Sequence, residues 1–167
     1  MTEIPDLWPS DGETFVGRSG TMPVEVLMEQ AKLLGAKTRG LLEGVVTTSH
    51  FDANDEGHPD AGQDIRFHHV LWARAPHLGD YRHALLSLTH DMAPFPVVVQ
   101  LAGVAESTGA DGLWRANNQE ELLEALRAAL SHEATRSVVS YLVAQSRAHS
   151  AARAGRTGGL YSGAQGA

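Results

Sequence analysis

The stretch at residues 65–73, IRFHHVLWA, decides the fold, because side chains of opposite character alternate along it. One side carries the mainly apolar set Ile65, Phe67, His69, Leu71 and Ala73, and the other carries Arg66, His68, Val70, Trp72 and Arg74. A period of two is typical of a β-strand that buries one of its faces. The stretch therefore predicts a half-buried strand within a sheet.

Three further strands are predicted around this one, at residues 41–49, 81–90 and 95–102. The first is rich in β-branched residues, and the links that follow the second and third strands are as short as hairpins require. Strands joined by such short links pair in antiparallel fashion. The four strands therefore predict an antiparallel meander, and residues 103–116 are expected to form a loop.

Helices are predicted before and after the strands in the sequence. A first helix near residues 22–34 has Thr21 as its expected N-cap and Gly35 as its expected stop. A second helical region covers residues 118–148 and begins at Asn117 or Asn118, with Ser131 as a possible restart, so that one bent helix or two both fit. This order predicts an α+β fold whose antiparallel sheet has its helices packed on one face.

The chain of 167 residues is the size of one domain, which we place at residues 21–149. Residues 1–20 form an arm interrupted by Pro and Gly, and residues 150–167 form a Gly/Ala-rich tail for which disorder is the default. Both ends nevertheless carry large side chains, among them Trp8 and Tyr161. We expect one or both ends to pack on a protein partner or a second subunit, with a homodimer as the commonest solution.

Composition excludes several classes of protein. The chain has no cysteine, so disulfide frameworks, thiolate zinc sites and cysteine nucleophiles are ruled out. A net charge of −7 and the lack of a Lys/Arg cluster argue against nucleic-acid binding. The first residues are acidic, unlike a signal peptide, and no apolar run approaches membrane-spanning length. A cytoplasmic protein that binds neither membranes nor nucleic acid is expected.

Histidine and aspartate supply the only candidate catalytic residues. His69 could meet His83 or His90 across strands, depending on the register, and Asp91 follows directly. His68 and His69 are adjacent in one strand and must point to opposite faces. The HExxH motif of zinc enzymes is absent, and residues 52–64 lack the last acidic ligand of a calcium loop, so no metal and no cofactor is expected.

The polar side of the strand at residues 65–73 is the candidate binding face. It comprises Arg66, His68, Trp72 and Arg74, and Arg82 can join from the next strand. Tryptophan beside arginines suits an acidic partner, through cation–π and charge-assisted contacts, although solvated arginines are the simpler interpretation. The leading hypothesis is a non-enzymatic protein-binding or assembly module. The alternative is a small hydrolase that uses the histidine and aspartate residues.

Overall fold

The computed structural model describes residues 21–52, 65–103 and 112–157. Its elements follow the chain in the order α1 (Pro23–Lys37), β1 (Glu43–Asp52), β2 (Ile65–Ala75), the 3-10 turn η2 (Pro76–Leu78), β3 (Tyr81–His90), β4 (Val97–Leu101), β5 (Leu113–Ala116), α2 (Gln119–Ser131) and α3 (Glu133–Thr157). Residues 53–64, most of the segment compared above with a calcium loop, lie outside these ranges. So do the two ends of the chain that carry Trp8 and Tyr161.

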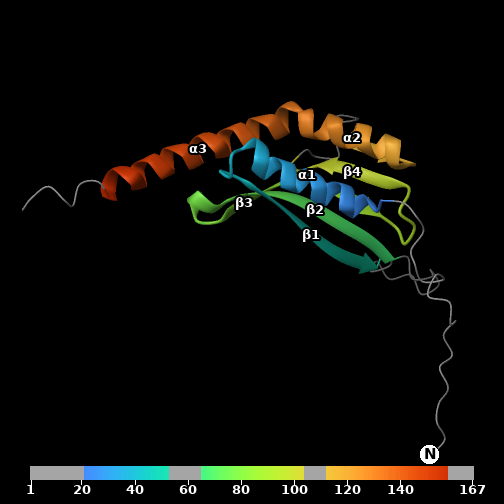
Figure 1. Cartoon of the computed structure of the whole chain (residues 1–167). Helices are drawn as coiled ribbons and strands as arrows, with labels where there is room; N and C mark the ends of the chain where they lie inside the picture. Colours follow the sequence, from blue (N-terminus) through green and yellow to red (C-terminus); the bar gives the residue numbers. More distant parts are fainter. Residues whose placement is uncertain (1–20, 53–64, 104–111, 158–167) are drawn as a thin grey trace, which may run out of the picture.

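The sheet is an antiparallel meander in the order β1-β2-β3-β4-β5. Its helices lie on one face, as Figure 1 shows: α1 packs on β1 and β2, α2 on β4 and β5, and α3 on η2 and β2. This arrangement confirms the predicted α+β fold. Among the described residues, no helix combines the length and the apolar character needed to cross a bilayer.

The fifth strand corrects the prediction that residues 103–116 form a loop. Within that segment β5 pairs with β4, from Gln100 opposite Leu113 to Val97 opposite Ala116. Four residues are too few for alternation to be recognised in the sequence. Pairing with β4 supplies the backbone hydrogen bonds that make this short piece a strand.

The helix ends also differ from the prediction. The N-cap of α1 is Met22, one residue after Thr21, and its backbone N–H donates to the Glu25 carboxylate at 2.8 Å. The helix passes through Gly35 and ends at Lys37. Its C-cap is Thr38, whose hydroxyl donates to the Leu34 carbonyl at 2.9 Å. The left-handed backbone conformation that commonly follows a helix end is adopted by the next two residues, Arg39 and Gly40.

The C-terminal region contains two helices, with His132 between them. Asn118 caps α2 as predicted: its side chain accepts a hydrogen bond from the Glu121 N–H at 2.9 Å. Helix α3 continues to Thr157 and so includes residues 150–157, which the composition assigned to the tail. Figure 1 shows this last part of α3 extending past the sheet.

The core lies between the helices and one face of the sheet, which we call the helix face. Fully buried leucines and valines from three strands meet leucines from α1 and α2 there, including Leu71, Leu86, Leu88, Val97, Val99, Leu27 and Leu122. The buried side predicted from alternation in β2 is therefore the observed one.

A β-bulge in β3 changes which side chains reach each face. Leu71 pairs with Leu86 but Trp72 pairs with Ala84, so Leu85 is an extra residue. Both Leu85 and Leu86 are buried. The bulge reverses the alternation before it, which puts His83 opposite Ala73 on the helix face and Arg82 opposite Arg74 on the other face.

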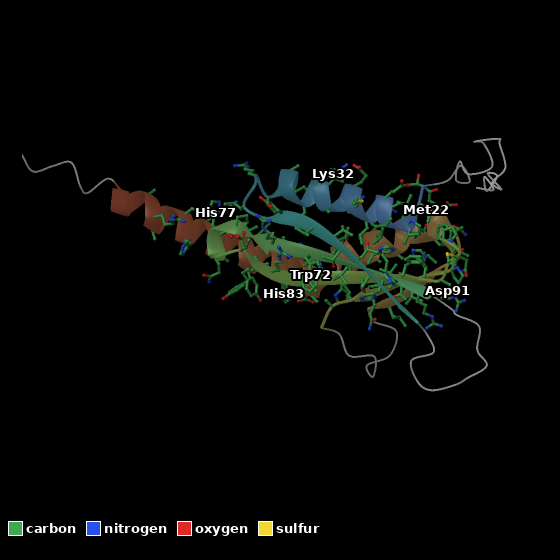
Figure 2. The ribbon with its side chains drawn as sticks, turned by 90° about the horizontal axis from the view of Figure 1, so that it is seen from below. Met22, Lys32, Trp72, His77, His83 and Asp91 are labelled. Carbon is green, nitrogen blue, oxygen red and sulfur yellow. The ribbon has the colours of Figure 1, made fainter. Side chains whose placement is uncertain are left out.

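The second face of the sheet, the open face, has no helix over it among the described residues. Figure 2 views the molecule from this side, with Trp72 labelled near the middle of the sheet. Arg66, His68, Trp72 and Arg74 alternate on it along β2, and Arg82 joins them from β3.

Candidate functional site

Two of the predicted histidines meet on the helix face. His69 of β2 and His90 of β3 lie on neighbouring strands, and their Nε2 atoms are 3.0 Å apart. Both side chains are buried, and the Phe67 ring stacks beside them with its centroid 5.5 Å from that of His90. The pairing of Phe67 with His90 in the sheet register brings these three rings together.

The hydrogen-bond partners determine which ring nitrogens carry protons. Nδ1 of His90 lies 2.7 Å from the Asp91 carbonyl oxygen, which can only accept, so His90 carries its proton on Nδ1. When Nδ1 carries the only proton of the His90 ring, its Nε2 accepts from the Nε2–H of His69. Nδ1 of His69 is left as an acceptor for the Thr48 hydroxyl, 2.8 Å away on β1. The result is a directed chain of three hydrogen bonds from Thr48 to the Asp91 backbone.

This environment favours the neutral form of His69. Burial is the largest cause, and the nearby His90 and His68 add to it, so that the pKa of His69 falls from 6.5 to about 4. At neutral pH His69 is therefore uncharged, and each ring nitrogen of His69 and His90 has a hydrogen-bond partner.

The other two candidate catalytic residues do not join this pair. The carboxylate of Asp91 is exposed and lies 3.2 Å from Nε of Arg66; only its backbone carbonyl reaches His90. His83 lies towards the end of the sheet from which α3 extends, and Asp91 lies near the opposite end (Figure 2). There His83 lines a recess together with Tyr81 and Tyr141.

Thr48, His69 and His90 have the connectivity of a nucleophile, a base and a group that orients the base. Two observations weigh against catalysis by them. A pKa of about 4 makes His69 a weak base at neutral pH. The larger cavities lined entirely by described residues do not include Thr48, His69 or His90.

The two histidine rings are linked by a hydrogen bond. Their centroids are 5.1 Å apart and their Nε2 atoms 3.0 Å apart. Two imidazoles alone would supply only two of the three or four protein ligands that a zinc site needs. Across residues 21–52, 65–103 and 112–157, no three His, Cys, Asp or Glu side chains are grouped closely enough to hold an ion.

The open face carries the predicted binding residues on adjacent strands. Trp72 is half-buried, and its indole N–H donates to the Thr47 hydroxyl of β1 at 2.9 Å, which holds the ring in one orientation. His68 lies beside Thr89 of β3, with Nδ1 3.1 Å from the hydroxyl oxygen. Thr47 and Thr89 are partners that sequence analysis missed, because their role depends on the pairing register.

The arginines of the open face fall into two groups. Arg66 pairs with Asp91, and Arg74 lies within 3.5 Å of the Glu43 carboxylate and 3.1 Å of the Asp80 carboxylate. Arg115 of β5 pairs with Val98, between the buried Val97 and Val99, and so lies on the open face as well. Arg82 and Arg115 are exposed and form no ion pair with any described residue. Arg82 stands directly opposite Arg74 in the sheet, and like charges in that position repel. The face therefore retains uncompensated positive charge.

Comparisons with protein-family models, with curated proteins and with solved structures found no match to this chain. The case for its function consequently depends on the geometry of the two faces.

Proposed function

We propose that this protein is a non-catalytic binding module whose protein partner presents acidic side chains to the open face of the sheet. The observation that carries the proposal is the unequal covering of the two faces. Three helices pack on the helix face, whereas no described helix covers the face that holds Trp72 among arginines. Tryptophan and arginine are enriched among the residues that carry most of the binding energy of protein interfaces.

Charge favours a different protein as the partner over a second copy bound through the same face. A symmetric dimer through the open face would bring Arg82 and Arg115 of both subunits into one interface, which costs free energy through like-charge repulsion. An acidic partner would instead pair with these two arginines, and guanidinium–carboxylate pairs are strong when both hydrogen bonds form. A homodimer built through the chain ends stays a separate prediction.

The test begins with a photo-crosslinking amino acid at the exposed Ser49 of β1, opposite His68 on the open face, in the native host. The captured protein is then purified, and its binding to this chain is measured by titration calorimetry. We expect Trp72→Ala to weaken binding at least tenfold, as loss of a central aromatic does, and Arg82→Glu to weaken it through charge reversal.

Glu124→Ala, at an exposed position of α2, is the control and should bind the partner like the wild type. Equal binding by Trp72→Ala, Arg82→Glu and the control contradicts the proposed site. A partner that binds through a basic surface contradicts the proposed chemistry. Light scattering of the free chain tests whether it self-associates. If it does so through the open face, Arg82→Glu should change the measured oligomeric state.

The hydrolase alternative has one observation in its favour, the chain from Thr48 through His69 to His90. Turnover of a general ester substrate that is abolished by Thr48→Val and by His69→Gln would support it. Turnover unaffected by both variants would exclude these residues as the catalytic group.

A further inference from the structure

A groove separates α1 from α3 on the helix face, away from the open face discussed above. Leu71 of β2 and Leu85 of β3 form its floor, and it encloses about 470 Å³, a volume typical of sites for small organic ligands. The groove exists because α1 packs on β1 and β2 while α2 packs on β4 and β5. The bulge in β3 adds Leu85 to its floor.

The walls of this α1–α3 groove are apolar. Leu33 and Leu34 of α1 face Val139 and Val143 of α3 across it. Leu33 has 46% of its surface exposed, and the other three side chains are half-buried, so apolar area stays open to a ligand. An apolar concavity of this kind on a protein surface is typical of a binding site.

The charged side chains that line the groove are all cationic. Lys37, Arg136 and Arg147 line it, and no carboxylate does, although the chain has 20 acidic and 13 basic residues. All three cations are exposed, and none forms an ion pair with a described residue. The groove therefore concentrates unpaired positive charge around apolar surface, against the net charge of the molecule.

The cations are placed at particular points along the groove. Helices α1 and α3 run in the same direction beside it (Figure 1), so Lys37 near the end of α1 and Arg147 lie towards one end. Arg136 lies at the other end, eleven residues earlier on α3, which corresponds to about 16 Å along the helix. Between them the surface is mainly apolar.

We propose that the α1–α3 groove binds a linear amphipathic carboxylate, with the acyl chain over Leu71 and Leu85 and the carboxylate between Lys37 and Arg147. An extended twelve-carbon chain measures roughly 14 Å from its C–C bond lengths, and it fits between the two ends of the groove. The apolar walls supply burial of the methylene groups, and the two cations supply charge-assisted hydrogen bonds to the carboxylate.

The test uses three probes of equal chain length with the full chain: dodecanoate, dodecanol and dodecylammonium. Titration calorimetry below the micelle concentrations should show one dodecanoate per chain. Dodecanol should bind at least tenfold more weakly because it lacks the charge, and dodecylammonium should not bind. Equal affinity for dodecanoate and dodecanol, or no binding of dodecanoate, overturns the proposal.

Variants on exposed positions locate the site without disturbing the core. Ser140→Trp places a large ring in the groove and should abolish dodecanoate binding. Ser137, also exposed on α3, does not line the groove, so Ser137→Trp should preserve dodecanoate binding. The double variant Lys37→Ala and Arg147→Ala should lower dodecanoate affinity at least tenfold and leave dodecanol affinity unchanged. Binding that survives Ser140→Trp places the ligand elsewhere and overturns the assignment.

The same titrations distinguish other occupants and the other site. If residues 1–20 or a second copy of the chain fill the groove, dodecanoate fails to bind to the wild type. Light scattering of the wild type and of a chain lacking residues 1–20 then shows whether the chain is an oligomer, and so which of the two fills the groove. Trp72→Ala on the open face should leave dodecanoate affinity unchanged. Failure of this proposal is therefore separate from failure of the proposed protein-binding function.

Discussion

Ala31 of α1 lies directly against Gly44 of β1: a Cβ atom added to Gly44 would collide with the Ala31 carbonyl oxygen. It would also collide with the Cα and the carbonyl carbon of Ala31, and all three atoms belong to the backbone. This contact lets α1 pack closely on β1, which places α1 as one wall of the α1–α3 groove.

We predict that Gly44→Ala destabilises the protein by about 1–3 kcal/mol, because a helix backbone cannot rotate away as a side chain can. Gly35→Ala is the matched control. Its Cβ would meet only the Leu42 carbonyl oxygen at 3.6 Å, an ordinary contact, so the change should stabilise α1 by about 0.5–1 kcal/mol. Urea unfolding of both variants measures the difference, and a neutral Gly44→Ala would show that the contact is not rigid.

The second prediction concerns pH and the His69–His90 pair. The pKa of His69 in the folded chain, about 4, is below its ordinary value of 6.5, so the unfolded chain binds a proton that the folded chain does not. The stabilisation from neutral His69 is complete above pH 6.5 and is lost as the pH falls towards 4. Free energies of unfolding measured across this range should therefore decrease.

His69→Gln isolates this contribution. The glutamine amide can still donate to His90 and accept from Thr48, but it does not titrate. We expect a cost of about 1–2 kcal/mol at neutral pH and a shallower decline between pH 6.5 and 4. His50→Gln, a change at an exposed histidine of β1, should keep the wild-type slope. If His69→Gln keeps that slope as well, the pair is not what makes stability depend on pH in this range.

The third prediction concerns the start of α2. The side chain of Asn118 accepts from the Glu121 N–H at 2.9 Å and donates to the Glu121 carboxylate at 2.9 Å. Asn118→Ala removes both hydrogen bonds and should cost about 1 kcal/mol in the free energy of unfolding.

Asn117→Ala is the control for the cap. The Asn117 backbone N–H still donates to the Glu121 carboxylate at 2.8 Å in that variant, so the loss should stay within about 0.5 kcal/mol. Thermal unfolding of the two variants compares them directly. Equal losses would mean that the position of the cap in this structure is wrong.

Local patterns in the sequence were sufficient where a segment is long and regular. Alternation in β2 predicted that Phe67 and Leu71 face the core while Trp72 faces away, and the short links predicted antiparallel pairing. The cap at Asn118 was also predictable, because its side chain bonds to a backbone group only three residues ahead. Each of these depends on contacts within a few residues, or on a period that a strand repeats several times.

Register and packing decided what such patterns leave open. Regular alternation along β3 would put His83 and His90 on opposite faces, but the bulge at Leu85 puts both on the helix face. The meeting of His69 with His90, and the hydroxyl of Thr48 beside them, follow from how three strands align. No pattern within one strand contains that alignment, which accounts for Thr48 being missed.

By itself, then, the sequence determined the α+β class, the face of β2 that is buried and the lack of any cysteine chemistry, since these follow from composition and short periods. Tertiary structure alone decided that β5 pairs with β4, that His69 is held neutral, and that Lys37 and Arg147 border one apolar groove. The physical reason is distance along the chain. Lys37 and Arg147 are separated by most of the domain, and only the packing of α1 and α3 on a common sheet brings their charges to the same groove.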